Sequence, residues 1–153
     1  GGDITYSGTV SAAIEGTLLG IPSFAISLAI QGNHDRYWYE TAGEFAFKLA
    51  KLITERGLPK DTLLNVNVPN LPMERLKGAK VTFQGNKRYK DSVIEKTDPR
   101  GRKYFWIGGS ELMPDNAEGA DHQVVVDGFI SVTPLHLDLT NYSCMEELKG
   151  WNL

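Results

Sequence analysis

The chain has 153 residues, of which 41% are hydrophobic and 23% are charged, a length that suits about one domain with its own core. Its formal net charge of −3 lacks the basic surface of general nucleic-acid binders, so no specific nucleic-acid partner is expected. Its single cysteine, Cys144, excludes an internal disulfide framework. With no run near the ~20 apolar residues of a membrane span and no visible signal peptide, a cytoplasmic protein is expected.

The first half of the chain alternates between helical and strand patterns. Val10, Ala13 and Ile14 lie on one stripe, as in an amphipathic helix, and Gly20 follows as a left-handed cap. Gly57 ends a second amphipathic helix in the same way. The predicted helix, strand, helix and strand span residues 9–19, 22–29, 40–56 and 63–68. Such alternation predicts parallel strands joined by crossover helices, and therefore an α/β fold. Two strands make an incomplete parallel sheet, so further strands are expected beside them.

After Pro72 the pattern changes to short extended segments. A long β-hairpin is predicted over residues 89–108, because residues 98–101, Asp-Pro-Arg-Gly, form a tight turn. An acidic irregular linker is expected over residues 109–120. Strands are expected over 123–126 and 129–133, joined by a turn at 127–128, and a terminal helix is expected over 141–151.

Ser7, Gly8 and Thr9 form a small-residue loop that runs into the first helix. Free backbone amides and the positive end of the helix dipole converge there, which is the arrangement of an anion site. The two hydroxyl groups add donors, and Gly8 lets the backbone approach a ligand closely. Simple capping of the helix by Ser7 or Thr9 is the alternative, and the residues alone leave both readings open.

Five segments together resemble the SurE family of metal-dependent nucleotidases. They occur in the family's order and span nearly the whole chain. The segments are YSGTVSAAIEG at 6–16, GIPSFAIS at 20–27, LLNVNVP at 63–69, VDGFISVTPL at 126–135 and DLT at 138–140. The resemblance implies part of a Rossmann-like three-layer fold with an appended β-hairpin arm. It implies three regions: residues 1–72 in the nucleotidase core, 73–137 in the arm and late strands, and 138–153 in a terminal helix.

The resemblance also implies an activity, the hydrolysis of nucleoside 5′- or 3′-monophosphates and of short polyphosphate. Ser7, Gly8 and Thr9 match the family's phosphate-binding loop. The family holds Mg²⁺ or Mn²⁺ mainly through adjacent aspartates, and this sequence contains no adjacent aspartates. Asp3 matches a flanking residue. The catalytic residues and metal ligands are therefore expected upstream of Gly1, and the chain alone is expected to be inactive. The alternative is a non-catalytic oligomerisation or phosphate-binding module.

Other polar residues are assigned less specific roles. His34 beside Asp35 is typical of a solvated turn, and His122 and His136 lack partners at metal-ligand spacing. The predicted hairpin interleaves basic and aromatic residues, which suits either nucleic-acid binding or packing on another subunit. The second reading, a homodimer or homotetramer formed through the hairpin, is expected here.

Overall fold

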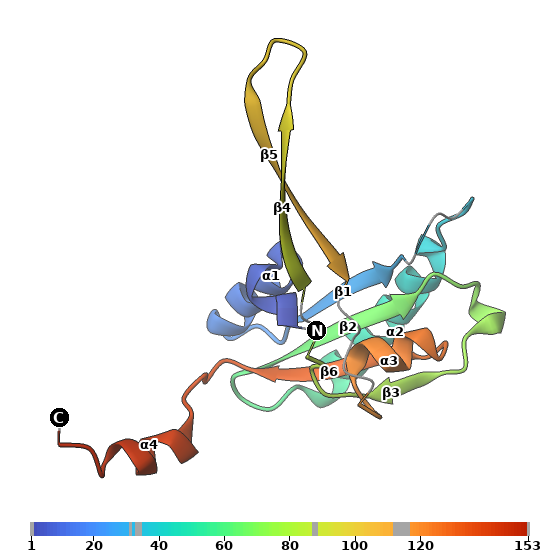
Figure 1. The fold of residues 1–153 in the computed structure, drawn as a ribbon. Coiled ribbons are helices and arrows are strands. Elements are labelled where there is room, and N and C mark those ends of the chain that lie inside the picture. The colour runs from blue at the N-terminus through green and yellow to red at the C-terminus, as the bar shows by residue number, and fades with distance from the viewer. Residues whose placement is uncertain (1, 31, 33–34, 87–88, 112–116, 153) are drawn as a thin grey trace.

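The computed structural model describes residues 2–30, 32, 35–86, 89–111 and 117–152 (Figure 1). Within them, one sheet has the strand order β1-β2-β6-β3, and β4 and β5 form a separate two-stranded sheet. The elements along the chain are η1 (Gly2–Tyr6), α1 (Gly8–Leu18), β1 (Phe24–Ala29), α2 (Tyr39–Arg56), β2 (Thr62–Pro69), η2 (Met73–Arg75), β3 (Ala79–Val81), β4 (Tyr89–Thr97), β5 (Lys103–Glu111), α3 (Asp121–Val126), β6 (Ile130–His136) and α4 (Tyr142–Leu148).

Helices cover both faces of the four-stranded sheet. β1 pairs in parallel with β2, and α2 is the crossover between them. Ile26 of β1 packs against the core that contains Leu49 of α2, whereas its neighbour Ala25 packs against Val10 of α1. Because successive strand residues point to opposite faces, α1 and α2 lie on opposite sides of the sheet. The predicted α/β class is confirmed, and α1, β1, α2 and β2 match their predicted bounds to within two residues.

The sheet is mixed, whereas the first half of the sequence predicted parallel strands. β6 pairs antiparallel with β2, and β3 pairs in parallel with β6. α3 precedes β6 and ends near the edge where β1 and β2 finish. Ala29 of β1, Pro69 of β2 and Val125 of α3 line the same cavity there. A strand that starts at this edge has to run in the opposite direction to β2. The antiparallel pairing therefore follows from the place at which the chain returns from the hairpin.

The predicted hairpin is present and is longer than expected. β4 and β5 pair antiparallel from Tyr89 opposite Glu111 to Thr97 opposite Lys103. Gly101 closes the predicted turn with a positive φ of 80°, and its N–H donates to the carbonyl of Asp98 at 3.0 Å. The hairpin projects from the body as an arm (Figure 1). We call residues 89–111 the arm.

The strand predicted for residues 123–126 is wrong, because these residues lie in α3. Valine favours strands, but the packing of this turn overrides that weak preference. Asp121 places its carboxylate in the first helical turn, where its Oδ1 accepts the N–H groups of His122 and Gly85. The turn at 127–128 therefore closes a helix, with Gly128 at φ 88°, and does not close a hairpin.

The predicted linker over 109–120 is also partly wrong. Its first three residues belong to the end of β5, and residues 112–116 lie outside the described part of the chain.

The terminal helix is shorter than predicted. It spans Tyr142–Leu148, and the side-chain oxygen of Asn141 caps it by accepting the N–H of Cys144 at 3.0 Å. α4 extends away from the sheet at the C-terminal end of the chain (Figure 1). None of the described helices is both long enough and apolar enough to cross a membrane.

Candidate functional site

The start of α1 presents backbone N–H groups that no described residue accepts. Ser7 is the N-cap, with extended φ and ψ of −83° and 115°, and its Oγ accepts the N–H of Val10 at 3.3 Å. The N–H groups of Gly8 and Thr9 have no hydrogen-bond acceptor within the described part of the chain. Both residues are exposed, and a Cβ placed on Gly8 would meet open space. Capping by Ser7 is therefore real, and two further amides are left for a ligand.

This arrangement suits the binding of an anion. The first amides of a helix point along its axis, and the helix dipole adds a partial positive charge at the same point. The hydroxyl groups of Ser7 and Thr9 can donate to an oxyanion, and no side chain at position 8 obstructs its approach. The 11 residues of α1 give the full turns over which this dipole accumulates.

The fold places the start of α1 at the edge where the parallel strands end. α1 finishes at Leu18, and a turn at Gly20 leads directly into the beginning of β1. Helix and strand therefore run in opposite directions, so that the first residue of α1 lies toward the carboxyl ends of β1 and β2 (Figure 1). Ligands of open α/β sheets bind at this edge.

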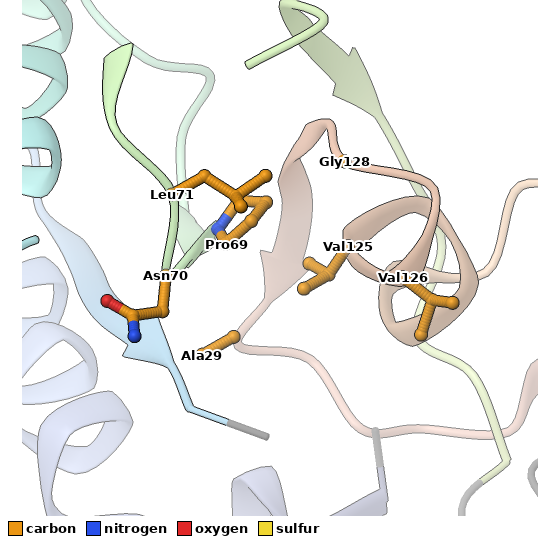
Figure 2. Close-up of a pocket in the computed structure, with 7 residues that line it drawn as sticks. All are labelled: Ala29, Pro69, Asn70, Leu71, Val125, Val126 and Gly128. Atoms are coloured by element: carbon orange, nitrogen blue, oxygen red, sulfur yellow. The ribbon is translucent and has the colours of Figure 1, made fainter. Parts of the chain in front are cut away.

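A cavity of about 150 Å³ opens at the same edge. It lies between the last residues of β1 and β2 and the end of α3, and its lining is mainly apolar (Figure 2). The residues that line it are Ala29, Pro69, Asn70, Leu71, Val125, Val126 and Gly128. We call it the edge pocket.

Asn70 joins the loops that follow β1 and β2. It is 9% exposed, its Oδ1 accepts the N–H of Trp38 at 2.9 Å, and its Nδ2 donates to the carbonyl of Arg36 at 3.0 Å. The Arg36 guanidinium also stacks over the Trp38 ring, 3.7 Å from its centroid. One buried amide thus fixes the segment before α2 at the border of the edge pocket.

The polar residues considered in the sequence do not form a metal site, as far as the structure describes them. Among the described residues, no three His, Cys, Asp or Glu side chains lie in a group that could hold a metal ion. His136 is exposed and its Nδ1 accepts the N–H of Asp138 at 3.1 Å. His34 and the side chain of Asp3 lie outside the described residues, and Asp35 is exposed.

His122 is the unusual member of this group. Both of its ring nitrogens are buried and have no hydrogen-bond partner among the described residues, and Nδ1 lies 3.7 Å from the carboxylate of Asp121. The ring packs against Gly85, where an added Cβ would approach Nδ1 to 2.5 Å. Its position at the two chain segments that enter and leave the arm indicates a packing role.

A larger, mostly apolar groove of about 470 Å³ lies along the inner side of α1. It is bordered by Val10 and Ile14 of the helix, by Leu63 and Leu135 of the sheet, and by Leu139 beyond β6. It extends toward the beginning of β2, which pairs with the end of β6 at Thr62 opposite His136. Ile4 and Thr5, just before the cap Ser7, also line it. The groove therefore begins beside the start of α1 and extends toward the opposite edge of the sheet.

Comparison with known proteins assigns the chain to a family. The family model described as "Survival protein SurE" matches residues 1–91, more than half of the chain. The chain belongs to the SurE family. It is 56% identical over 152 residues to a protein of Geobacter metallireducens named 5′-nucleotidase SurE, with 99% of this chain and 60% of that protein covered.

Two further SurE proteins support this assignment. A protein of Geobacter sulfurreducens, also named 5′-nucleotidase SurE, is 54% identical over 153 residues, which cover 100% of this chain and 58% of that protein. The crystal structure of the SurE protein from Aquifex aeolicus superposes with a TM-score of 0.80 at 46% identity, covering 97% of this chain and 59% of that one. The chain thus spans about 60% of the length of these SurE relatives.

The sequence pointed to the start of α1 but not to the edge pocket. Ala29, Val125 and Val126 are small or apolar residues without a chemical signature, and residues 123–126 were assigned to a strand. The one available signal was Asn70, a polar residue directly after a buried strand that ends in proline. A polar residue in that position lies at the ligand-binding edge of an α/β sheet.

Proposed function

We propose that this SurE chain takes part in the hydrolysis of nucleoside monophosphates, with the start of α1 as the binding site for the substrate phosphate. The observation that carries the proposal is the pair of exposed N–H groups at Gly8 and Thr9, which no described residue accepts. A phosphate group with several acceptor oxygens matches these donors and the helix dipole. The relatives' name, 5′-nucleotidase, supports the same substrate class.

The chemistry of phosphate esters determines which roles belong to a metal and which belong to this chain. Their uncatalysed hydrolysis is among the slowest known, and a divalent metal such as Mg²⁺ or Mn²⁺ supplies Lewis acidity and an activated water. The described residues do not fit such a metal, since no group of three suitable ligands occurs among them. We therefore assign binding and orientation of the phosphate to Ser7, Gly8 and Thr9, and no proton transfer or metal ligation to the described residues.

We further propose that the arm binds a second copy of the chain. β4 and β5 form a sheet of their own, and a two-stranded hairpin is marginally stable alone in water. Three large side chains near its centre, Ile94, Phe105 and Trp106, are exposed by 45%, 61% and 64%. Burial of such aromatic groups drives subunit association, so a homodimer or homotetramer is the expected state.

A non-catalytic phosphate-binding module is the second candidate, because the N–H groups of Gly8 and Thr9 can hold a phosphate without hydrolysing it. Release of phosphate from a nucleoside monophosphate in the presence of Mn²⁺ separates the two. Turnover that depends on Thr9 supports the nucleotidase. Phosphate binding without turnover, in protein that carries the full length of the relatives, supports the module.

The phosphate site is tested by replacing Thr9 with valine, which keeps the side-chain shape and removes one hydroxyl donor. Hydrogen bonds to charged groups contribute about 1.5–3 kcal/mol, so the affinity for inorganic phosphate, measured by calorimetry, should fall about tenfold or more. Thr17→Val, near the other end of α1, is the matched control and should leave phosphate affinity unchanged. Equal affinity in wild type and Thr9→Val would mean that the loop is only a cap.

A further inference from the structure

The face of the sheet that α1 covers becomes polar and then apolar toward its carboxyl edge. Along β2, Leu63 packs against α1, and Asn65, Asn67 and Pro69 follow at every second position on the same face. On β1, Ala25 packs against α1, and Ser27 and Ala29 follow in the same way. Pro69 and Ala29 line the edge pocket, so the pocket lies on the face and at the edge where α1 begins.

Two helices border this part of the sheet. α1 contacts β1 and β2, whereas α3 contacts β2 and β6. The strip of sheet between the two helices is the end of β2. Along its α1-facing side, Asn67 comes first and Pro69, which lines the edge pocket, follows at the end of the strand. Figure 2 shows Val125 and Val126 of α3 on one side of the pocket and Ala29 on the other. A ligand held by its phosphate at the start of α1 would extend over this strip.

Asn67 leaves one hydrogen-bonding group for such a ligand. Its Nδ2 donates to Ser131 Oγ at 3.3 Å, and its Oδ1 accepts no hydrogen bond within the described part of the chain. The side chain is half-buried, and the neighbouring Ser27 is exposed. A carbonyl oxygen beside a hydroxyl can pair with ribose hydroxyls or with the edge of a base.

The size of the pocket limits what it can hold. Sites for whole ligands of drug size measure about 300–1,000 Å³, and the edge pocket has about 150 Å³. It therefore admits one ring system. Its walls of proline, leucine and valine suit the flat apolar faces of a heterocycle.

We propose that the edge pocket binds the nucleobase of the substrate, with Asn67 oriented toward the nucleoside, while the start of α1 binds the phosphate. This inference rests on the proposed function and adds the residues that would distinguish a nucleotide from other phosphate esters. The two halves of the substrate are recognised by separate elements, so each can be removed without the other.

The test compares the binding of inorganic phosphate and adenosine 5′-monophosphate to wild type and variants by calorimetry. Wild type should bind the nucleotide about tenfold or more tightly than phosphate, since burial of a base adds affinity. Ala29→Trp fills the pocket and should reduce nucleotide affinity to that of phosphate. Ala50→Trp, on an exposed position of α2, is the matched control and should change neither.

Unchanged phosphate binding shows that the Ala29→Trp protein is folded. Val126→Trp fills the pocket from a side chain that is already 58% exposed and should have the same effect with less risk to folding. Equal affinities for phosphate and nucleotide in wild type, or nucleotide affinity unaffected by both tryptophans, would overturn the base pocket and leave the phosphate site intact. The base pocket would also be overturned if the tryptophan variants changed the oligomeric mass but not the nucleotide affinity. That result would assign the pocket to contact with a second copy of the chain. Failure of wild type to bind either ligand would overturn both proposals.

Discussion

Ser7 illustrates how one residue can serve stability and binding together. Its Oγ accepts the N–H of Val10, which satisfies one of the amides that a helix start leaves free. The hydroxyl hydrogen is not used by that bond and can still be donated to a ligand. The two readings of the sequence, a cap and an anion site, are therefore compatible at this position, and a single alanine substitution would not separate them.

Replacement of Ser7 by alanine and by aspartate separates the two roles. Ser7→Ala should lower the free energy of unfolding by about 1 kcal/mol, because the cap is lost. Ser7→Asp keeps a good N-cap and should keep near wild-type stability, while its negative charge repels phosphate. Urea unfolding and phosphate calorimetry on the same samples measure both effects. Phosphate affinity in Ser7→Asp equal to that of wild type would place the anion elsewhere.

At the scale of elements, the sequence predicted what local pattern determines and missed what distant contacts determine. The helices and strands of the first half repeat with clear apolar periods and end at Gly20 and Gly57, both with positive φ. α3 was missed because three successive valines carry no helical period. Its geometry depends on Asp121, whose carboxylate accepts the N–H of Gly85 from 36 residues away.

The link between β6 and α4 is held by a carboxylate that ionises unusually easily. The hydroxyl of Thr140 first, and then the hydroxyl of Tyr142 and the N–H of Thr140, stabilise the charged form and lower the pKa of Asp138 to about 2 from 3.8. The N–H of Thr140 lies 2.8 Å from Oδ1, and the Tyr142 hydroxyl donates to Oδ2. The same contact raises the pKa of Tyr142. The carboxylate thus orients the first turn of α4.

Because the folded pKa of Asp138 is depressed, its contribution to the turn is fully present above pH 3.8 and is lost as the pH falls through about 2. Carbon-detected NMR of the Asp138 carboxyl should show a midpoint near pH 2. In Tyr142→Phe, which removes one donor, the midpoint should move upward, whereas Tyr104→Phe in the arm should not move it. An unchanged midpoint in Tyr142→Phe would show that the tyrosine contact does not form in solution.

At the scale of the whole molecule, the arm stands apart as a two-stranded sheet of its own. Residues that lie opposite each other in the antiparallel register point to the same face, so Ile94 and Trp106 share one face with Tyr104. Val93 and Phe105 lie on the other face, and all five are exposed. An arm with apolar side chains on both faces buries more of them between two protein surfaces than against one.

A shortened arm tests the proposed assembly. Val93 and Ile107 are paired, so an Asn-Gly turn can replace residues 94–106 without disturbing the base of the hairpin. This variant should elute as a monomer in size-exclusion chromatography with light scattering. The control replaces only residues 98–102 with Asn-Gly between the paired Thr97 and Lys103, keeps the aromatic residues and should retain the wild-type mass. An unchanged mass in the shorter variant would contradict a role for the arm.

The candidate site was only partly predictable for a similar reason. Ser7, Gly8 and Thr9 are contiguous and carry a recognisable motif, whereas the edge pocket gathers Ala29, Pro69 and Val125 from three separate segments. Apolar residues acquire a binding role only when the fold brings them together. Such a set has no period or spacing to recognise in a single sequence.

The two apolar faces of the arm also affect the order in which the protein folds. A hairpin that is exposed on both sides gains little from forming before its surroundings exist. In the proposed assembly, the ordering of β4 and β5 and their burial by a second copy become one event. By mass action, the arm's contribution to stability then grows with protein concentration, and dilution would release the arm before the four-stranded sheet unfolds.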